Sequence, residues 1–165
     1  MKDNQKELFI VVDKDDNILD YRTRYDCHHD KSLIHRVTDI AIFNDEGKLL
    51  LQKRSKTKDL FPGYYTLSAS GHVDQGEEYM QAATRELFEE LGVANISLEM
   101  VGKIMVVSEY ETEMVAVFTG YHNGPFKFRE DEVESVQFFS LEEVKNIKNL
   151  TPVAENCLKL LKILN

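Results

Sequence analysis

The segment from Gly71 to Val93 constrains this chain more than any other, because it places three carboxylates on one face of a predicted helix. Glu86, Glu89 and Glu90 stand at i, i+3 and i+4, positions that share a helical face. Like charges at this spacing repel by roughly a few tenths of a kcal/mol per pair, so a compensating cation is expected. Clustered oxygen ligands suit Mg²⁺ or Mn²⁺. The segment therefore predicts a metal site on a helix.

An isolated run of glutamates is more often a solvated helix face than a metal site, and two details of this segment weigh against that interpretation. Gly71, Gly76 and Gly92 stand where a loop turn and a helix C-cap require glycine. Arg85 precedes Glu89 by four residues, a spacing at which the two charges pair. Both details favour a built site over a random acidic stretch.

The order of these residues resembles the Nudix box. Gly71, Glu77 and the run Arg85-Glu86-Leu87-x-Glu89-Glu90-x-Gly92-Val93 occupy every defined position of that motif. Members of the Nudix superfamily mostly cleave a diphosphate linked to another group, with water as the nucleophile. The resemblance implies an α/β fold, namely the α/β/α sandwich with a mixed sheet, and a hydrolase acting on a nucleoside di- or triphosphate or a related organic diphosphate.

The resemblance also assigns roles within the box. It gives catalysis and metal binding to the three glutamates, and it makes Glu77 and Arg85 structural. The implied metal ligands are the carbonyl of Gly71, Glu86, Glu89 and Glu90. The general base varies across the family, so it stays open between Glu90 and a carboxylate outside the box. The implied cofactor is Mg²⁺ or Mn²⁺, the implied partner is a small phosphorylated substrate, and a homodimer is a further expectation because dimers are common in the family.

The flanking sequence resembles the branch that contains type 1 isopentenyl-diphosphate isomerase. Phe61-Pro62-Gly63-Tyr64-Tyr65 and Ser68-Ala69-Ser70-Gly71-His72 stand where that branch has a Trp-Pro-Gly-type loop and a Cys-Gly-His segment. Two histidines seven residues apart and a Glu-x-Glu pair also match. The second metal site that this resemblance implies consists of His28, His35, His72, Glu111 and Glu113. Such a donor set suits Mn²⁺, Zn²⁺ or Mg²⁺.

Two departures argue against isomerase chemistry. The isomerase has a cysteine immediately before its Gly-His, where this chain has Ser70, and a hydroxyl is a far weaker acid than a thiol with a pKa of about 8.5. The isomerase also uses a tryptophan to stabilise a carbocation, and this chain contains no Trp. Hydrolysis is therefore the favoured function, isomerisation is the alternative, and a Nudix domain that only senses a nucleotide or metabolite is a third.

Basic residues near the end of a predicted strand are candidate phosphate ligands. In the implied fold, the strand that contains Lys53 and Arg54 faces the box, and arginine offers a bidentate fork to phosphate. A solvated strand end explains the pair equally well. Lys56 and Lys58 follow in a loop and are expected to be exposed.

Composition limits the classes of partner and compartment. The chain has 165 residues and a formal net charge of −9, which argues against binding a nucleic-acid polymer through its phosphates. No apolar run approaches the roughly 20 residues of a membrane span, and Met1 to Glu7 lack the apolar region of a signal peptide. Cys27 and Cys157 do not suggest a secreted disulfide framework. A cytoplasmic protein without membrane partners is the expectation.

The remaining pattern predicts a single Nudix domain over residues 1–165, rich in strands. An N-terminal hairpin is expected at about 7–24, with a turn at 13–17, and the box at 71–93 contains a helix over 77–91. Ala83, Leu87 and Leu91 form a stripe that should face the core. Further strands are expected at 37–43, 48–54, 64–70, 96–100, 103–109, 113–121 and 133–139. Ser140 opens a short helix with a capping box, and Pro152 begins a C-terminal helix at about 152–164.

Overall fold

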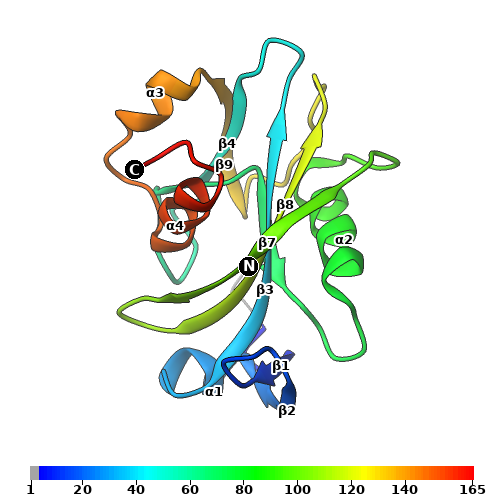
Figure 1. Cartoon of the computed structure of the whole chain (residues 1–165), viewed down its shortest axis with the longest axis vertical. Coiled ribbons are helices and arrows are strands. Elements are labelled where there is room, and N and C mark those ends of the chain that lie inside the picture. Colours follow the sequence, from blue (N-terminus) through cyan, green and yellow to red (C-terminus); the bar gives the residue numbers. More distant parts are fainter. Residues whose placement is uncertain (1–3) are drawn as a thin grey trace.

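A mixed β-sheet runs through the middle of the computed structural model, which describes residues 4–165 (Figure 1). Its strands within that range are β1 (Leu8–Val12), β2 (Ile18–Thr23), β3 (Ile34–Phe43), β4 (Leu49–Arg54), β5 (Tyr65–Thr66), β6 (Ala69–His72), β7 (Glu99–Val107), β8 (Thr112–Tyr121) and β9 (Val133–Phe139). The helices are α1 (Arg24–His29), α2 (Tyr79–Leu91), α3 (Leu141–Lys145) and α4 (Pro152–Leu160).

Strand β3 is the centre of the sheet. It pairs in parallel with β8 along its whole length, and antiparallel with β1, β4 and β6. Strand β7 pairs antiparallel with β8, and β9 pairs antiparallel with β4. Within the described residues, β1 of the N-terminal hairpin pairs with β3 at two positions, Val11 with His35 and Val12 with Ile34. This arrangement brings the start of β3, the end of β6 and the start of β8 together.

Helices α2 and α4 cover opposite faces of the sheet (Figure 1). Helix α2 buries Ala83, Leu87 and Leu91 in one core, which confirms the predicted stripe. Helix α4 buries Cys157 and Leu158 in the second core. Burying one such leucine contributes about 1.5–3 kcal/mol relative to exposure. The two cores make the α/β/α sandwich that the resemblance implies, so the predicted fold class is confirmed.

Several element boundaries differ from the prediction. The expected strand at 64–70 is divided into β5 and β6, because the hydroxyl of Ser68 between them bonds backbone groups of Ile42 and Leu50. The two strands expected between residues 96 and 109 form the single β7, whose register shifts between Met100 and Gly102. A bulge absorbs the irregularity there without ending the strand.

The ends of the chain also differ from the prediction in part. The hairpin is confirmed, but the helix α1 that follows it was not predicted. The C-terminal helix ends at Leu160 instead of about 164, with Ile163 still buried beneath it. The domain prediction includes residues 1–3, which lie outside the described residues, so a single domain over the full range stays a prediction. Among the residues described, no helix has the length and apolar character needed to cross a membrane.

Candidate functional site

A polar cavity of about 330 Å³ is lined by residues of both predicted constellations, although His35 is not among them. Glu86, Glu89 and Glu90 line it from α2. It is also lined by His28 of α1, His72 of β6, Glu111 just before β8, and Glu113 of β8. The volume lies at the lower end of the range for small-molecule sites. One cavity therefore brings together residues from the Nudix box and from the second predicted metal site.

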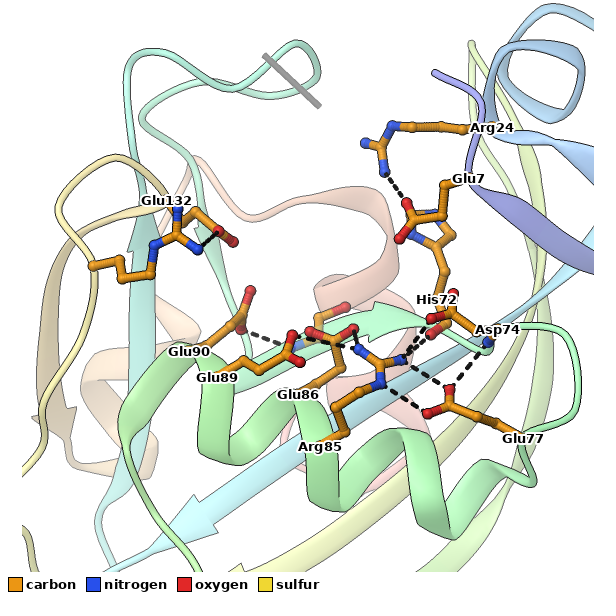
Figure 2. Close-up of polar contacts among 12 residues, drawn as sticks. Glu7, Arg24, His72, Asp74, Glu77, Arg85, Glu86, Glu89, Glu90 and Glu132 are labelled. Carbon is orange, nitrogen blue, oxygen red and sulfur yellow. Dashed lines mark hydrogen bonds and ion pairs between the residues drawn. The ribbon is translucent and has the colours of Figure 1, made fainter. Parts of the chain in front are cut away.

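Arg85 fixes the loop of the box to its helix (Figure 2). Its guanidinium donates to both carboxylate oxygens of Glu77, at 2.8 and 2.9 Å, and to the carbonyl of His72 at 3.0 Å. A further nitrogen donates to Glu86. The predicted partner Glu89 is 3.5 Å away and half-exposed, so it is the weakest of these contacts. The hydrogen bond from Arg85 lowers the pKa of Glu77.

Glycine at position 71 leaves the space that Glu86 occupies. A Cβ built on Gly71 would overlap the carboxylate of Glu86, so the two residues approach as closely as they do because position 71 has no side chain. Burial raises the pKa of Glu86 to about 7, although the adjacent Arg85 opposes this shift. The carboxylate is thus held between a strand backbone and a guanidinium.

Glu90 has a different set of partners. Its Oε2 accepts from the backbone N–H of Ser70 at 3.1 Å and from the side-chain amide of Gln52 at 3.3 Å. Burial raises its pKa well above the ordinary value, and the negative charge of Glu86 adds to the effect. Both carboxylates therefore lie where their negative charge is poorly solvated, as is expected of groups that bind a cation.

The second constellation contains a tight group of four donors. One ligand atom from each of His28, His35, His72 and Glu111 lies within 4.8 Å of the others. His28 Nε2 is 2.9 Å from Glu111 Oε2, and His35 Nε2 is 3.6 Å from that oxygen. Neither contact has hydrogen-bond geometry, and these buried atoms have no hydrogen-bond partner among the described residues. Glu113, the fifth predicted ligand, lines the same cavity but lies outside this four-residue group.

Burial keeps the imidazoles of His35 and His72 neutral. It lowers the pKa of His35 to about 4 and that of His72 well below its ordinary value. It also raises the pKa of Glu113, helped by the negative charge of Glu111. Neutral imidazoles present lone pairs, which is the state in which histidine binds metals.

Strand register explains why residues distant in sequence meet here. On β3, His35 pairs with Glu113 of β8, and Val37 pairs with His72 of β6. The hairpin contributes Phe9, whose ring lies beside three of the histidines and stacks on His72. The second predicted constellation thus lies where the hairpin and α1 meet the sheet.

The candidate phosphate ligands Lys53 and Arg54 are not brought together. Lys53 pairs with Glu134 at 2.8 Å and does not line the cavity. Arg54 lines the cavity and donates to the carbonyl of Leu60. Lys58, expected to be exposed, is half-buried and lines the cavity as well.

Two functional candidates were absent from the sequence prediction. Arg24 begins α1 and lines the cavity near Glu7 (Figure 2). The spacing of Thr23 and Asp26, which form the capping box of α1, is the signal that would have revealed this helix. Gln52 contacts Glu90 from the buried face of β4, and no sequence motif marks it.

Both donor sets fit divalent metal ions. The box offers clustered carboxylates and a close backbone strand, which suit the oxygen-preferring Mg²⁺ and Mn²⁺. The four-donor group offers three imidazoles and a carboxylate, and buried ring nitrogens of His28 and His35 have no hydrogen-bond partner among the residues described. Buried polar atoms without partners are costly, and a bound cation would satisfy them.

Comparisons with known proteins agree with the fold and the motif. A family model described as NUDIX domain matches residues 33–161. A protein of Pseudomonas aeruginosa named as an uncharacterized Nudix hydrolase is 33% identical over 145 residues, spanning 86% of this chain and 85% of the relative. An isopentenyl-diphosphate Delta-isomerase of Photorhabdus laumondii is 33% identical over 150 residues, spanning 88% and 84%.

A solved structure of the protein DR0079 from Deinococcus radiodurans superposes with a TM-score of 0.80 at 21% identity, covering 93% of this chain and 99% of that one. At this identity the likeness concerns the fold alone. The family model and the curated relatives go further, because each spans most of the chain. The chain therefore belongs to the Nudix hydrolase superfamily.

Proposed function

We propose that the chain is a Mg²⁺- or Mn²⁺-dependent pyrophosphohydrolase that cleaves a diphosphate bond in a nucleoside di- or triphosphate or a related organic diphosphate. The observation that carries the proposal is the convergence of Glu86, Glu89 and Glu90 on one cavity, beside Gly71. Membership of a superfamily whose relatives are named Nudix hydrolases supports it.

In this proposal, Glu86, Glu89, Glu90 and the carbonyl of Gly71 hold the metal ions. When bound, such ions neutralise diphosphate charge and lower the pKa of a coordinated water. Arg85 keeps Glu86 oriented, and Ser70 and Gln52 keep Glu90 oriented. The general base is Glu90 or a carboxylate outside the box that lines the cavity, such as Glu113.

The substrate phosphates would bind to basic residues of the cavity. Arg54 approaches it from the end of β4, Lys58 from the loop after that strand, and Arg24 from α1. Arginine pairs with phosphate through two parallel hydrogen bonds. Lys53 contributes less in this proposal, because its ammonium is paired with Glu134 away from the cavity. The partner is thus a small phosphorylated molecule.

The test is a panel of nucleotides and organic diphosphates, assayed for released phosphate or pyrophosphate with Mg²⁺, with Mn²⁺ and with a chelator. Glu90→Gln should lower turnover by about 100-fold or more, because the bound metal supplies several kcal/mol. Glu155→Gln is a matched control on the exposed face of α4. Full activity of Glu90→Gln, or no product from any substrate, would contradict the proposal.

We further propose that His28, His35, His72 and Glu111, with Glu113 beside them, hold a second metal ion such as Mn²⁺, Zn²⁺ or Mg²⁺. The convergence of four donors within 4.8 Å carries this proposal, together with the buried atoms of His28, His35 and Glu111 that have no hydrogen-bond partner among the described residues. His28→Ala should remove one equivalent of tightly bound metal. His29→Ala is the matched control, since His29 is exposed and stacks on Tyr25. Equal metal content in the two variants would reject the second site.

The donor group and the isomerase relative favour isopentenyl-diphosphate isomerisation as the second candidate function. The discriminating measurement is deuterium exchange from D₂O into isopentenyl diphosphate. Because Ser70 stands in place of the acidic thiol, we expect no exchange. Detectable exchange would instead establish isomerase chemistry.

Three further expectations belong with this proposal. Tight nucleotide binding without turnover in the presence of metal would favour the sensing domain over the enzyme. Light scattering during gel filtration tests the expected homodimer. Fractionation of cells that express the chain tests the expected cytoplasmic location.

A further inference from the structure

We infer that Gln52 is a positioning residue that selects which oxygen of Glu90 is presented to the metal. This inference rests on the proposed function, in which Glu90 is a metal ligand. The amide nitrogen of Gln52 lies 3.3 Å from Glu90 Oε2. The residue is 2% exposed, so water does not replace this donor.

Two donors bind the same oxygen of Glu90. The backbone N–H of Ser70 reaches Oε2 from β6, and the amide of Gln52 reaches it from β4. Since both hydrogen bonds go to Oε2, the lone pairs of Oε1 remain for a cation in the cavity that Glu90 lines. Neither Glu86 nor Glu89 has this arrangement, because among the residues described their side chains accept hydrogen bonds from Arg85 alone.

The backbone of Gln52 is held on both sides. It pairs with Val136 of β9 and with Thr66 of β5, so the side chain extends from a fixed point in the sheet. The amide oxygen of Gln52 is buried and has no hydrogen-bond partner among the described residues. A buried polar side chain that leaves one atom unpaired is costly, which argues that the amide is present for its donor and not for packing.

The test uses Gln52→Met, which keeps the length of the side chain and removes the donor. Titration with Mn²⁺, followed by electron paramagnetic resonance of the free ion, measures the affinity of the folded protein. We expect the dissociation constant of the box site to rise by about 10- to 100-fold, the usual effect of losing a residue that orients a metal ligand. Excess Mn²⁺ should restore kcat to near the wild-type value, with the KM for substrate unchanged.

Two reference variants make the result decisive. Gln137→Met repeats the substitution at an exposed position of neighbouring β9 and should bind Mn²⁺ like the wild type. Glu90→Gln defines the loss of the site itself.

If Glu90→Gln loses Mn²⁺ but Gln52→Met does not, the positioning role is wrong while the proposed function stands. If Glu90→Gln binds Mn²⁺ with wild-type affinity, the proposed metal site of the box is wrong, and the inference about Gln52 falls with it. A lower melting temperature of Gln52→Met with unchanged Mn²⁺ affinity would show a merely structural role and also overturn the inference.

Discussion

The ring of Phe9 lies parallel to the imidazole of His72, with 3.8 Å between the ring centroids and 8° between their planes. Phe9 belongs to the N-terminal hairpin, and His72 ends the strand that leads into the Nudix box. The family model begins at residue 33, so the hairpin is additional to the matched domain. This contact joins the added segment to a histidine that lines the candidate active-site cavity.

Gly71→Ala should impair catalysis more than stability. The added Cβ would overlap the carboxylate of Glu86, and the flexible glutamate would move while the backbone stays. We expect metal-dependent activity to fall by at least about tenfold, as is usual when a ligand loses its orientation. Gly102→Ala is the control, because its Cβ would meet Leu160 at an ordinary 3.6 Å. Wild-type activity in Gly71→Ala would contradict the tight fit described here.

Asp16→Asn should destabilise the attachment of the hairpin. The carboxylate of Asp16 accepts hydrogen bonds from Arg36, Tyr79 and Lys103, joining the hairpin turn to β3, α2 and β7. Hydrogen bonds to a charged group contribute about 1.5–3 kcal/mol each, so the free energy of unfolding should fall by about 2–3 kcal/mol. Asparagine tolerates the positive φ of 65° at this position. Urea unfolding of Asp16→Asn beside the exposed control Asp15→Asn measures the difference, and equal stability of the two would refute the role of Asp16.

Asp39→Asn should change how stability depends on pH. Burial raises the pKa of Asp39 to about 8, whereas the unfolded chain releases this proton near pH 4. The contribution of Asp39 to stability is therefore fully present below about pH 4 and is lost as the pH rises through 8. Relative to the wild type, the variant should gain up to about 1.4 kcal/mol per pH unit in that window. Urea unfolding at several pH values tests this, and parallel curves for the two proteins would show that Asp39 does not titrate as described.

The sequence predicted the elements whose residues repeat with a clear period. Ala83, Leu87 and Leu91 recur at every fourth residue, and the structure buries all three. Helix α1 has only six residues, too short for such a stripe, and so it was not predicted. The two strands expected at 96–100 and 103–109 leave out Val101 and Gly102, yet strand β7 continues through a bulge there.

Site residues could be predicted where a motif gives their spacing in the sequence. They could not be predicted where the direction of a side chain decides whether it reaches the cavity. Lys53 and Arg54 are neighbours on a strand, so their side chains point to opposite faces, and only Arg54 reaches the cavity. The sequence does not tell which of the two does. The sequence does not predict the contact between Gln52 and Glu90 either, because this contact depends on how α2 packs against the sheet.

The three residues that end β6 connect the two constellations proposed to bind metal. Ser70 donates to Glu90, Gly71 makes room for Glu86, and His72 belongs to the histidine group. A one-residue insertion or deletion in this stretch would therefore disturb both constellations in a single event. Directed evolution of either constellation therefore has to leave the length of β6 unchanged.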